Sequence, residues 1–369
     1  MKYLFFILLF AIYSCHSKSR EEVLGDIPFS EIEVSQSELD LTKIYHSIEL
    51  VAFPDTPFIG RIKDVIVNDN FVYVLDDINN DIKVYNLKLD YLFSFGKQGP
   101  GPQEYHSITN IALVDNQIVV LSHFDMAILK FTLNGEFIEK VKLNDRLLGM
   151  VALKENFVTY SNYNSIFPEK PNLIVWGLDG TPKKMGANYT VDMPSLIGYS
   201  GGIAPNYDSP STFYFQKPLS DTLYQLDNNL HVKQVLKLKV LPNPWLGKIN
   251  DPNLTNIRHE YDYITDIKSV KDNFIRFSFV KNKRLRHGMA DVKTKVAYIE
   301  DSILPKGLVY FISKPAGIGS NGFHYSIPEY RWISYFPEGK PENIPSIFSD
   351  FKDKLGLENF KYLIRYKLK

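Results

Sequence analysis

The stretches Asn68–Asp76 (NDNFVYVLD) and Val114–Ser122 (VDNQIVVLS) share one pattern, a turn with Asn or Asp followed by a strand of alternating apolar residues. The pattern returns in Lys154–Ser161, Lys271–Phe279 and Ser320–Ile327. With the asparagine of each turn as a marker, successive copies lie 46, 40, 117 and 48 residues apart. The gap of 117 requires one more copy, and Pro210–Gln216 (PSTFYFQ) lies near its middle. The sequence therefore indicates six copies of one element.

Each copy belongs to a longer unit. A first strand precedes it, as in residues 60–67 (GRIKDVIV), and a third and a fourth strand follow, joined by a tight turn. Asn134-Gly135 and Asp179-Gly180 are typical of two-residue turns in which both central residues have positive φ. Four antiparallel strands repeated about every 50 residues describe a β-propeller blade. We predict an all-β fold, a six-bladed β-propeller of four-stranded antiparallel blades over residues 44–369.

The ends of this ring must meet, because an open blade would leave a sheet edge unpaired. We expect a strand near Tyr45–Val51 to join the last blade beside the C-terminal strand at Tyr362–Leu368. One short C-terminal helix is expected between Pro345 and Gly356, where apolar residues recur at helical spacing.

The composition excludes several classes of protein. The 369 residues contain 42 basic and 42 acidic side chains, so the chain lacks the positive charge typical of nucleic-acid binding. No apolar run approaches the roughly 20 residues of a membrane-spanning helix. A single cysteine excludes an intrachain disulfide and a cysteine-rich metal site.

That cysteine lies at the N-terminus. Residues 1–14 contain an early lysine and then an apolar stretch, which predicts a secretory signal. Ile12 to Cys15 (IYSC) resembles a bacterial lipobox, although Tyr13 departs from the usual small residue. We therefore predict a lipoprotein signal peptide over residues 1–14, lipidation of Cys15 and a tether over residues 15–43. The expected location is the bacterial cell envelope, at the outer membrane, with membrane contact through the lipid anchor only.

One blade carries a family resemblance. Residues 95–122 (FGKQGPGPQEYHSITNIALVDNQIVVLS) resemble an NHL-type repeat, with a glycine-rich turn, an aromatic residue before the next blade and an IAL strand. The mature chain, including its closing segment ENFKYLIRYKLK (358–369), is similar to a family of bacterial lipoproteins described as six-bladed β-propellers. The resemblance implies the fold and the envelope location, and it implies no common reaction.

Two apparent catalytic or nucleotide motifs lack their structural context. Gly198 to Gly202 fits G-x-S-x-G, but Pro205 and Pro210 follow, so no helix can begin behind the serine. Gly317 to Gly322 fits G-x-G-x-x-G, but a strand follows in place of the helix that phosphate binding needs. Both motifs are interpreted as turns or loops.

Asp64, Asn110 and Asp266 lie on predicted first strands and could point toward the ring axis. Some six-bladed propellers hydrolyse lactones around an axial calcium held by carboxylates and amides. The alternative function is therefore a calcium-dependent propeller enzyme of lactonase or lyase type with an axial site. The favoured expectation is no metal, no catalytic residue and no cofactor.

Long loops indicate where the protein binds. The connections between blades and some connections between second and third strands are long, and both classes emerge on the same side of a propeller. We call this side the loop-rich face. Binding residues concentrate on loops held by a rigid scaffold. The candidate ligand-binding residues on this face are Arg61, Glu104, Tyr105, His106, His123, Tyr163, Arg258, His259, Tyr261 and Arg284.

These side chains suit stacking and directional hydrogen bonds. We expect a lipid-anchored binding module whose partner is a carbohydrate, a peptide or an envelope protein, and not a nucleic acid. Two alternatives that involve no ligand stay open. Arg61 could pair with Glu104 only to fix the joint between the first two blades, and the basic cluster around Arg284 could be a solvated hairpin turn.

Overall fold

The computed structural model describes residues 28–189, 202–241, 262–271, 273–304, 314–327 and 361–369. These residues form strands β1 to β27 and two short 3-10 turns, η1 (Leu41–Lys43) and η5 (Glu300–Ser302). None of the described helical segments is long and apolar enough to cross a membrane. The expected helix between Pro345 and Gly356 and the lipidation site Cys15 lie outside the described residues.

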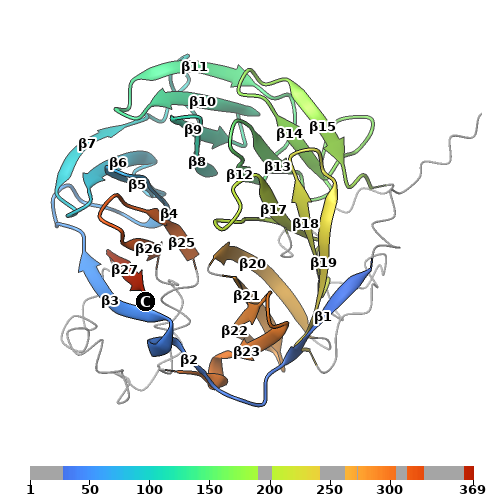
Figure 1. The fold of residues 1–369 in the computed structure, drawn as a ribbon. Coiled ribbons are helices and arrows are strands. Elements are labelled where there is room, and N and C mark those ends of the chain that lie inside the picture. The colour runs from blue at the N-terminus through green and yellow to red at the C-terminus, as the bar shows by residue number, and fades with distance from the viewer. Residues whose placement is uncertain (1–27, 190–201, 242–261, 272, 305–313, 328–360) are drawn as a thin grey trace, which may run out of the picture.

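Successive strands pair antiparallel in four-stranded units that are arranged around a central axis, each running from an inner strand to a rim strand (Figure 1). The described part of the chain contains six such units. The first three are β4 (Ile62–Val67), β5 (Phe71–Asp76), β6 (Asp81–Asn86) and β7 (Tyr91–Phe95); β8 (Asn110–Val114), β9 (Gln117–Ser122), β10 (Ala127–Thr132) and β11 (Phe137–Lys142); β12 (Gly149–Ala152), β13 (Phe157–Tyr160), β14 (Leu173–Trp176) and β15 (Pro182–Gly186).

The other three units complete the ring. They are β16 (Gly202–Pro205), β17 (Thr212–Gln216), β18 (Thr222–Asp227) and β19 (Val232–Lys239); β20 (Tyr263–Lys271), β21 (Phe274–Lys281), β22 (Arg284–Asp291) and β23 (Val296–Ile299); β25 (Lys314–Ile318), β26 (His324–Ile327), β27 (Tyr362–Leu368) and β3 (Tyr45–Ala52). This arrangement is a β-propeller. The predicted all-β propeller fold is confirmed.

Both ends of the chain close the ring in the predicted way. Strand β3 is the rim strand of the last unit, where it pairs antiparallel with the C-terminal strand β27 from Tyr362 opposite Ala52 to Leu368 opposite Tyr45. The pairing removes the open edge that β27 would otherwise present.

The predicted tight turns differ in type. At Gly135 and Gly180 only the glycine has positive φ, 79° in each case, and the strand register shifts next to the turn. These are bulged hairpins, so the expected two-residue turns with two positive φ angles are wrong. The two-residue turn occurs elsewhere, at Asn282 and Lys283, where φ is 52° and 65°.

Part of the predicted tether is structured. Strand β1 (Phe29–Val34) lies between the rim strands β19 and β23 and runs parallel to both, and it joins two blades into one nine-stranded sheet (Figure 1). Strand β2 (Leu39–Asp40) pairs with β24 (Ile303–Leu304). The expectation of a tether through residue 43 is therefore wrong for residues 29–40, because these residues satisfy backbone groups on the outer edges of other strands.

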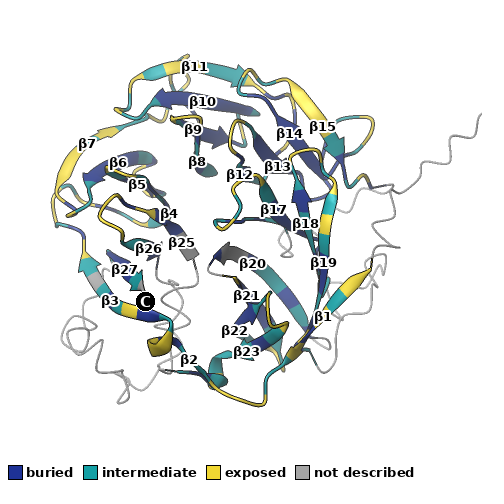
Figure 2. Ribbon diagram, viewed as in Figure 1, coloured by how far each residue is buried: buried dark blue, intermediate teal, exposed yellow. Residues whose placement is uncertain are grey.

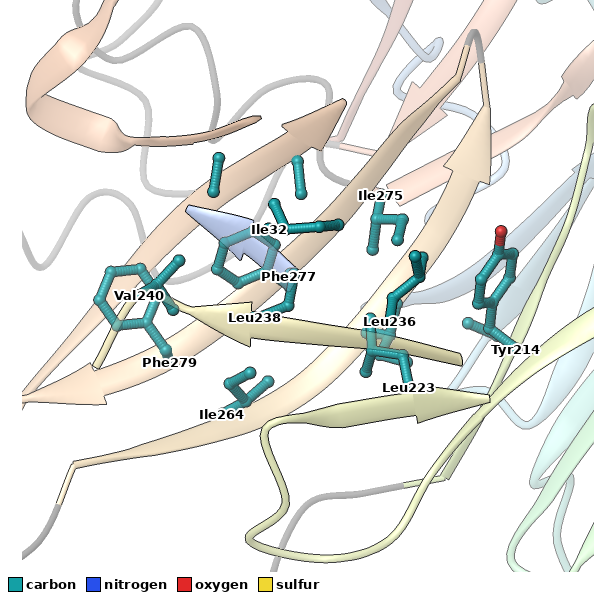
Figure 3. Packing of buried hydrophobic residues seen from close by; sticks show 14 residues of the cluster. Ile32, Tyr214, Leu223, Leu236, Leu238, Val240, Ile264, Ile275, Phe277 and Phe279 are labelled. Carbon is teal, nitrogen blue, oxygen red and sulfur yellow. The ribbon is translucent and has the colours of Figure 1, made fainter. Parts of the chain in front are cut away.

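The hydrophobic core lies between neighbouring blades. In the cluster of Figure 3, Leu236 and Leu238 of β19 face Ile275 and Phe277 of β21, with Ile32 of β1 among them. Four further clusters fill other joints between neighbouring blades. The buried residues gather on the inner and middle strands, whereas rim strands such as β7 and β15 are largely exposed (Figure 2). Each blade is thus held by its neighbours, which fixes the loops that project from the ring.

Candidate functional site

An axial cavity of about 470 Å³ lies at the centre of the ring. Its wall is formed by inner strands β4, β8, β12, β16 and β25 and by the residues that follow β16. Most of the wall is apolar, and the polar lining side chains are Asp64, Asn110, Asn206 and Tyr207. The volume falls in the range of small-molecule sites.

Two of the three residues considered for an axial metal line this cavity. Asp64 and Asn110 are among its lining residues, and Asp266 is not. Within the described residues no group of three or more His, Cys, Asp or Glu side chains is arranged to hold a metal ion.

Two of the charged residues predicted on the loop-rich face, Arg61 and Glu104, pair with other residues of the protein. The guanidinium of Arg61 contacts Asp77, whose carboxylate also lies 3.1 Å from Lys63 Nζ. Glu104 pairs with Lys97 at 3.1 Å and accepts a hydrogen bond from the Gly101 N–H. Neither contact joins Arg61 to Glu104, so the alternative in which these two residues pair to fix the joint between the first two blades is wrong.

Tyr105 is not available to a ligand. Its side chain is fully buried between the first two blades, and its hydroxyl donates a hydrogen bond of 2.9 Å to the Asn80 carbonyl. Burial raises the pKa of the Tyr105 phenol. The residue fills the joint between blades, which corrects its predicted role in binding.

His106 remains on the surface. Its Nδ1 lies 2.9 Å from Asp125 Oδ1, and its backbone N–H donates to the other oxygen of the same carboxylate. Although burial opposes it, hydrogen bonds from Ser122, from the His106 N–H and ring, and from Lys140 lower the pKa of Asp125. Asp125 stays ionised and fixes the orientation of the His106 ring at the surface.

The remaining candidates differ in how exposed their side chains are. His123 is half-buried, with Nδ1 3.0 Å from the Leu147 carbonyl, and Arg284 is exposed at the start of β22. Tyr163 is only 8% exposed and packs against Tyr189 with ring centres 5.1 Å apart, so its predicted role in binding is also wrong. Arg258, His259 and Tyr261 lie outside the described residues.

The exposed apolar residues of this face were missed by the sequence reasoning. Phe124 is 74% exposed and Ile78 is 61% exposed, and they occupy equivalent connections between second and third strands in the first two blades. Ile166 holds the corresponding connection in the third blade, and Phe58 precedes β4. A signal was present for two of them, since Ile78 and Phe124 stand among mostly polar residues in short loops, DDINND and SHFDM.

Buried carboxylates hold two of these loops in place. Asp76, fully buried, accepts hydrogen bonds from the backbone N–H groups of Gly60, Arg61 and Ile78. Asp145, also fully buried, accepts one from the Ile166 N–H at 2.8 Å. The exposed side chains of Ile78 and Ile166 are therefore presented on backbone that is fixed from beneath.

We call these four apolar residues the apolar tips, and the loops that carry Phe58, Ile78 and Phe124 are linked along the face. Asn79 Nδ2 donates to the Phe58 carbonyl at 3.2 Å, and the Ile78 side chain packs over Gly60. Asn80 Nδ2 donates to the His106 carbonyl at 3.3 Å, and His106 in turn contacts Asp125, next to Phe124. The loops of the first two blades thus form one connected surface.

Comparisons with known structures support the fold. The chain is similar to a putative exported protein from Bacteroides fragilis, with 14% identity and a TM-score of 0.66 over 92% of this chain and 100% of that one. It is also similar to a member of the duf4221 family from Bacteroides vulgatus, with 11% identity and a TM-score of 0.51 over 88% of this chain and 98% of that one. A comparison with curated proteins found no match. Residues 24–355 match the family described as "Domain of unknown function (DUF4934)", and the chain belongs to that family.

Proposed function

We propose that the protein is a six-bladed β-propeller of the bacterial cell envelope, lipid-anchored at Cys15, that binds a peptide or protein partner through its loop-rich face. One observation carries the proposal. Four of the large exposed apolar side chains, Phe58, Ile78, Phe124 and Ile166, stand on loops of this face, two of them on backbone bonded to buried carboxylates. Exposed apolar groups held in fixed positions are typical of interaction surfaces.

The chemistry favours a protein over a carbohydrate. Aliphatic and phenyl groups such as Ile78 and Phe124 offer apolar contact area and no hydrogen bonds. The polar residues between them are already engaged, Arg61 with Asp77 and His106 with Asp125. A partner would therefore bury the apolar tips at the centre of the contact and meet the charged groups at its rim.

The test is affinity capture with matched variants. The purified protein would be immobilised and exposed to envelope extract of its host, and the retained proteins quantified by mass spectrometry. We expect Ile78→Ser with Phe124→Ser to abolish retention of a partner that the wild-type protein captures. Ile138→Ser is the matched control, because Ile138 is 41% exposed but lies on rim strand β11. Equal loss in the control, or retention by the double variant, refutes the proposed face.

The anchor is tested separately. Labelled palmitate should enter the wild-type protein in its host and should not enter Cys15→Ala. Attachment through several acyl chains is stable, whereas a single chain binds membranes weakly. Absence of label from the wild-type protein would refute the anchor and leave the binding face untouched.

A further inference from the structure

The rim strand β7 of the first blade has an open outer edge. Among the described residues β7 pairs with β6 alone, so no strand lies along its other side. The strand is largely exposed at the rim (Figure 2). Tyr91 is 38% exposed and Leu92 is 43% exposed, and successive residues of a strand point to opposite faces. Apolar side chains therefore flank an edge whose backbone groups can pair with another strand.

Neighbouring rim strands carry features that prevent such pairing. Strand β11 contains Glu139, Lys140 and Lys142, and β15 begins with Pro182 followed by two lysines. Charged side chains and proline on an edge strand disfavour the addition of a further strand. The sequence of β7, YLFSF, contains no charged residue and no proline. The edge of β7 therefore lacks the protection that these two rim strands have.

The ring already accepts an added strand at its rim, since β1 pairs with the outer edges of β19 and β23. Strand β7 is also held in place from within. The ring centres of Phe95 and Phe131 lie 5.0 Å apart, and those of Tyr91 and Tyr85 lie 5.7 Å apart. A strand fixed in this way loses little conformational freedom when another strand pairs with it.

The charges beside β7 favour a second copy of the chain as the partner. Asp90 precedes the strand and Lys97 follows it closely, and both residues are exposed. Asp90 accepts a hydrogen bond from Asn86 Nδ2, and Lys97, whose side chain is 79% exposed, lies 3.1 Å from Glu104. When two copies of β7 pair antiparallel about a two-fold axis, Asp90 of one copy and Lys97 of the other lie at the same end of the pair. The edge is thus complementary to itself in charge.

We propose that two copies of this protein associate through β7, with the two strands antiparallel and the first blades of both rings joined into one sheet. The interface lies on the rim and does not use the apolar tips. It therefore does not depend on the function proposed for the loop-rich face.

Sedimentation velocity of the purified full chain over a dilution series measures the association. We expect an equilibrium between monomer and dimer in the wild-type protein, with slower hydrogen exchange of the β7 amides in the dimer. Leu92→Glu places a charge on the edge in both copies and should leave a monomer at every concentration. Phe29→Glu is the matched control, because Phe29 is 56% exposed but lies on β1, and it should associate as wild type does.

A mixing experiment identifies the partner as a second copy. Leu92→Lys alone should also be monomeric, whereas a mixture of Leu92→Glu with Leu92→Lys should form the dimer again, because opposite charges then face each other across the pair. Asp90→Lys covers the case in which the Leu92 variants fail to fold, since it changes an exposed residue outside the strand. It should weaken association about tenfold, because a like-charged pair then replaces an attractive one at both ends. Asp90→Lys combined with Lys97→Asp should restore association.

Three results would overturn the proposal. The first is a wild-type protein that stays monomeric over the whole dilution series. The second is a dimer that survives both Leu92→Glu and Asp90→Lys. The third is loss of the dimer in Phe29→Glu, which would place the interface elsewhere on the rim.

Discussion

Asp76 should be one of the most costly residues of the loop-rich face to remove. Its buried carboxylate accepts hydrogen bonds from four backbone N–H groups, those of Gly60, Arg61, Ile78 and Asn79. It also lies 3.0 Å from Lys83 Nζ, whose side chain is only 4% exposed. Asp76→Ala would leave that ammonium with Asp81 alone, at 2.5 Å. Removing one partner of a buried ion pair costs roughly 3–5 kcal/mol.

The matched control is the next residue. Asp77 contacts Arg61 and Lys63, whose side chains are 51% and 36% exposed, and each such surface pair contributes at most about 1 kcal/mol. An unfolding entropy of about 2.1 cal/mol/K per residue gives ~0.8 kcal/mol/K for a chain of this size, so Asp76→Ala should lower the melting temperature by ~4–6 °C and Asp77→Ala by less than ~3 °C.

Calorimetry and urea unfolding measure the loss, and hydrogen exchange locates it. In Asp76→Ala the amides of Gly60, Ile78 and Asn79 should exchange faster, whereas the Ile166 amide, held by Asp145, should not change. An Asp76→Ala protein that melts within about 1 °C of wild type, or an Asp77→Ala protein that loses as much, would refute this account of the face.

Although burial opposes it, hydrogen bonds lower the pKa of Asp76 to about 2 from its ordinary 3.8. The contribution of Asp76 to stability is therefore present above pH 3.8 and is lost as the pH falls toward 2. In acid titrations, the difference in unfolding free energy between wild type and Asp76→Ala should shrink over that interval. Ile32→Ala should cost ~2–4 kcal/mol in urea unfolding because Ile32 is fully buried, whereas Phe29→Ala, at a residue 56% exposed, should cost under ~0.5 kcal/mol. Gly317→Ala should lower the melting temperature because its Cβ would lie 2.2 Å from the Val67 carbonyl oxygen, whereas Gly149→Ala, whose Cβ meets only Ile203 at 3.9 Å, should be tolerated. Truncation before Tyr362 removes the strand between β26 and β3 and should abolish cooperative unfolding, and removal of Leu368 and Lys369 alone should not.

The ring could be predicted because its signal is local and repeated. Each copy of the turn and strand predicts one hairpin, and the spacing of the copies predicts their arrangement. Strand β1 could not be found in this way. Ile32 lies opposite Leu238, more than 200 residues away in the sequence. Nothing near FSEIEV in the sequence indicates that β19 and β23 have edges with which this segment can pair. A pairing that depends on two distant edges appears only once the ring is assembled.

Two of the side chains predicted for the site, Tyr105 and Tyr163, are buried, and the reason is physical. Tyrosine, histidine and arginine were selected because they suit ligand contacts, yet a joint between blades also needs large side chains that end in a polar atom. Tyr105 meets that need, since its ring fills the joint and its hydroxyl satisfies the Asn80 carbonyl. The Phe124 side chain has no polar atom that could hydrogen-bond to a buried backbone group, and it is 74% exposed. On a loop bounded by polar residues, the side chain without an internal partner is therefore the better candidate for contact with another molecule. Ile78, Phe124 and Ile166 meet this condition, whereas Arg61 and Tyr105 do not.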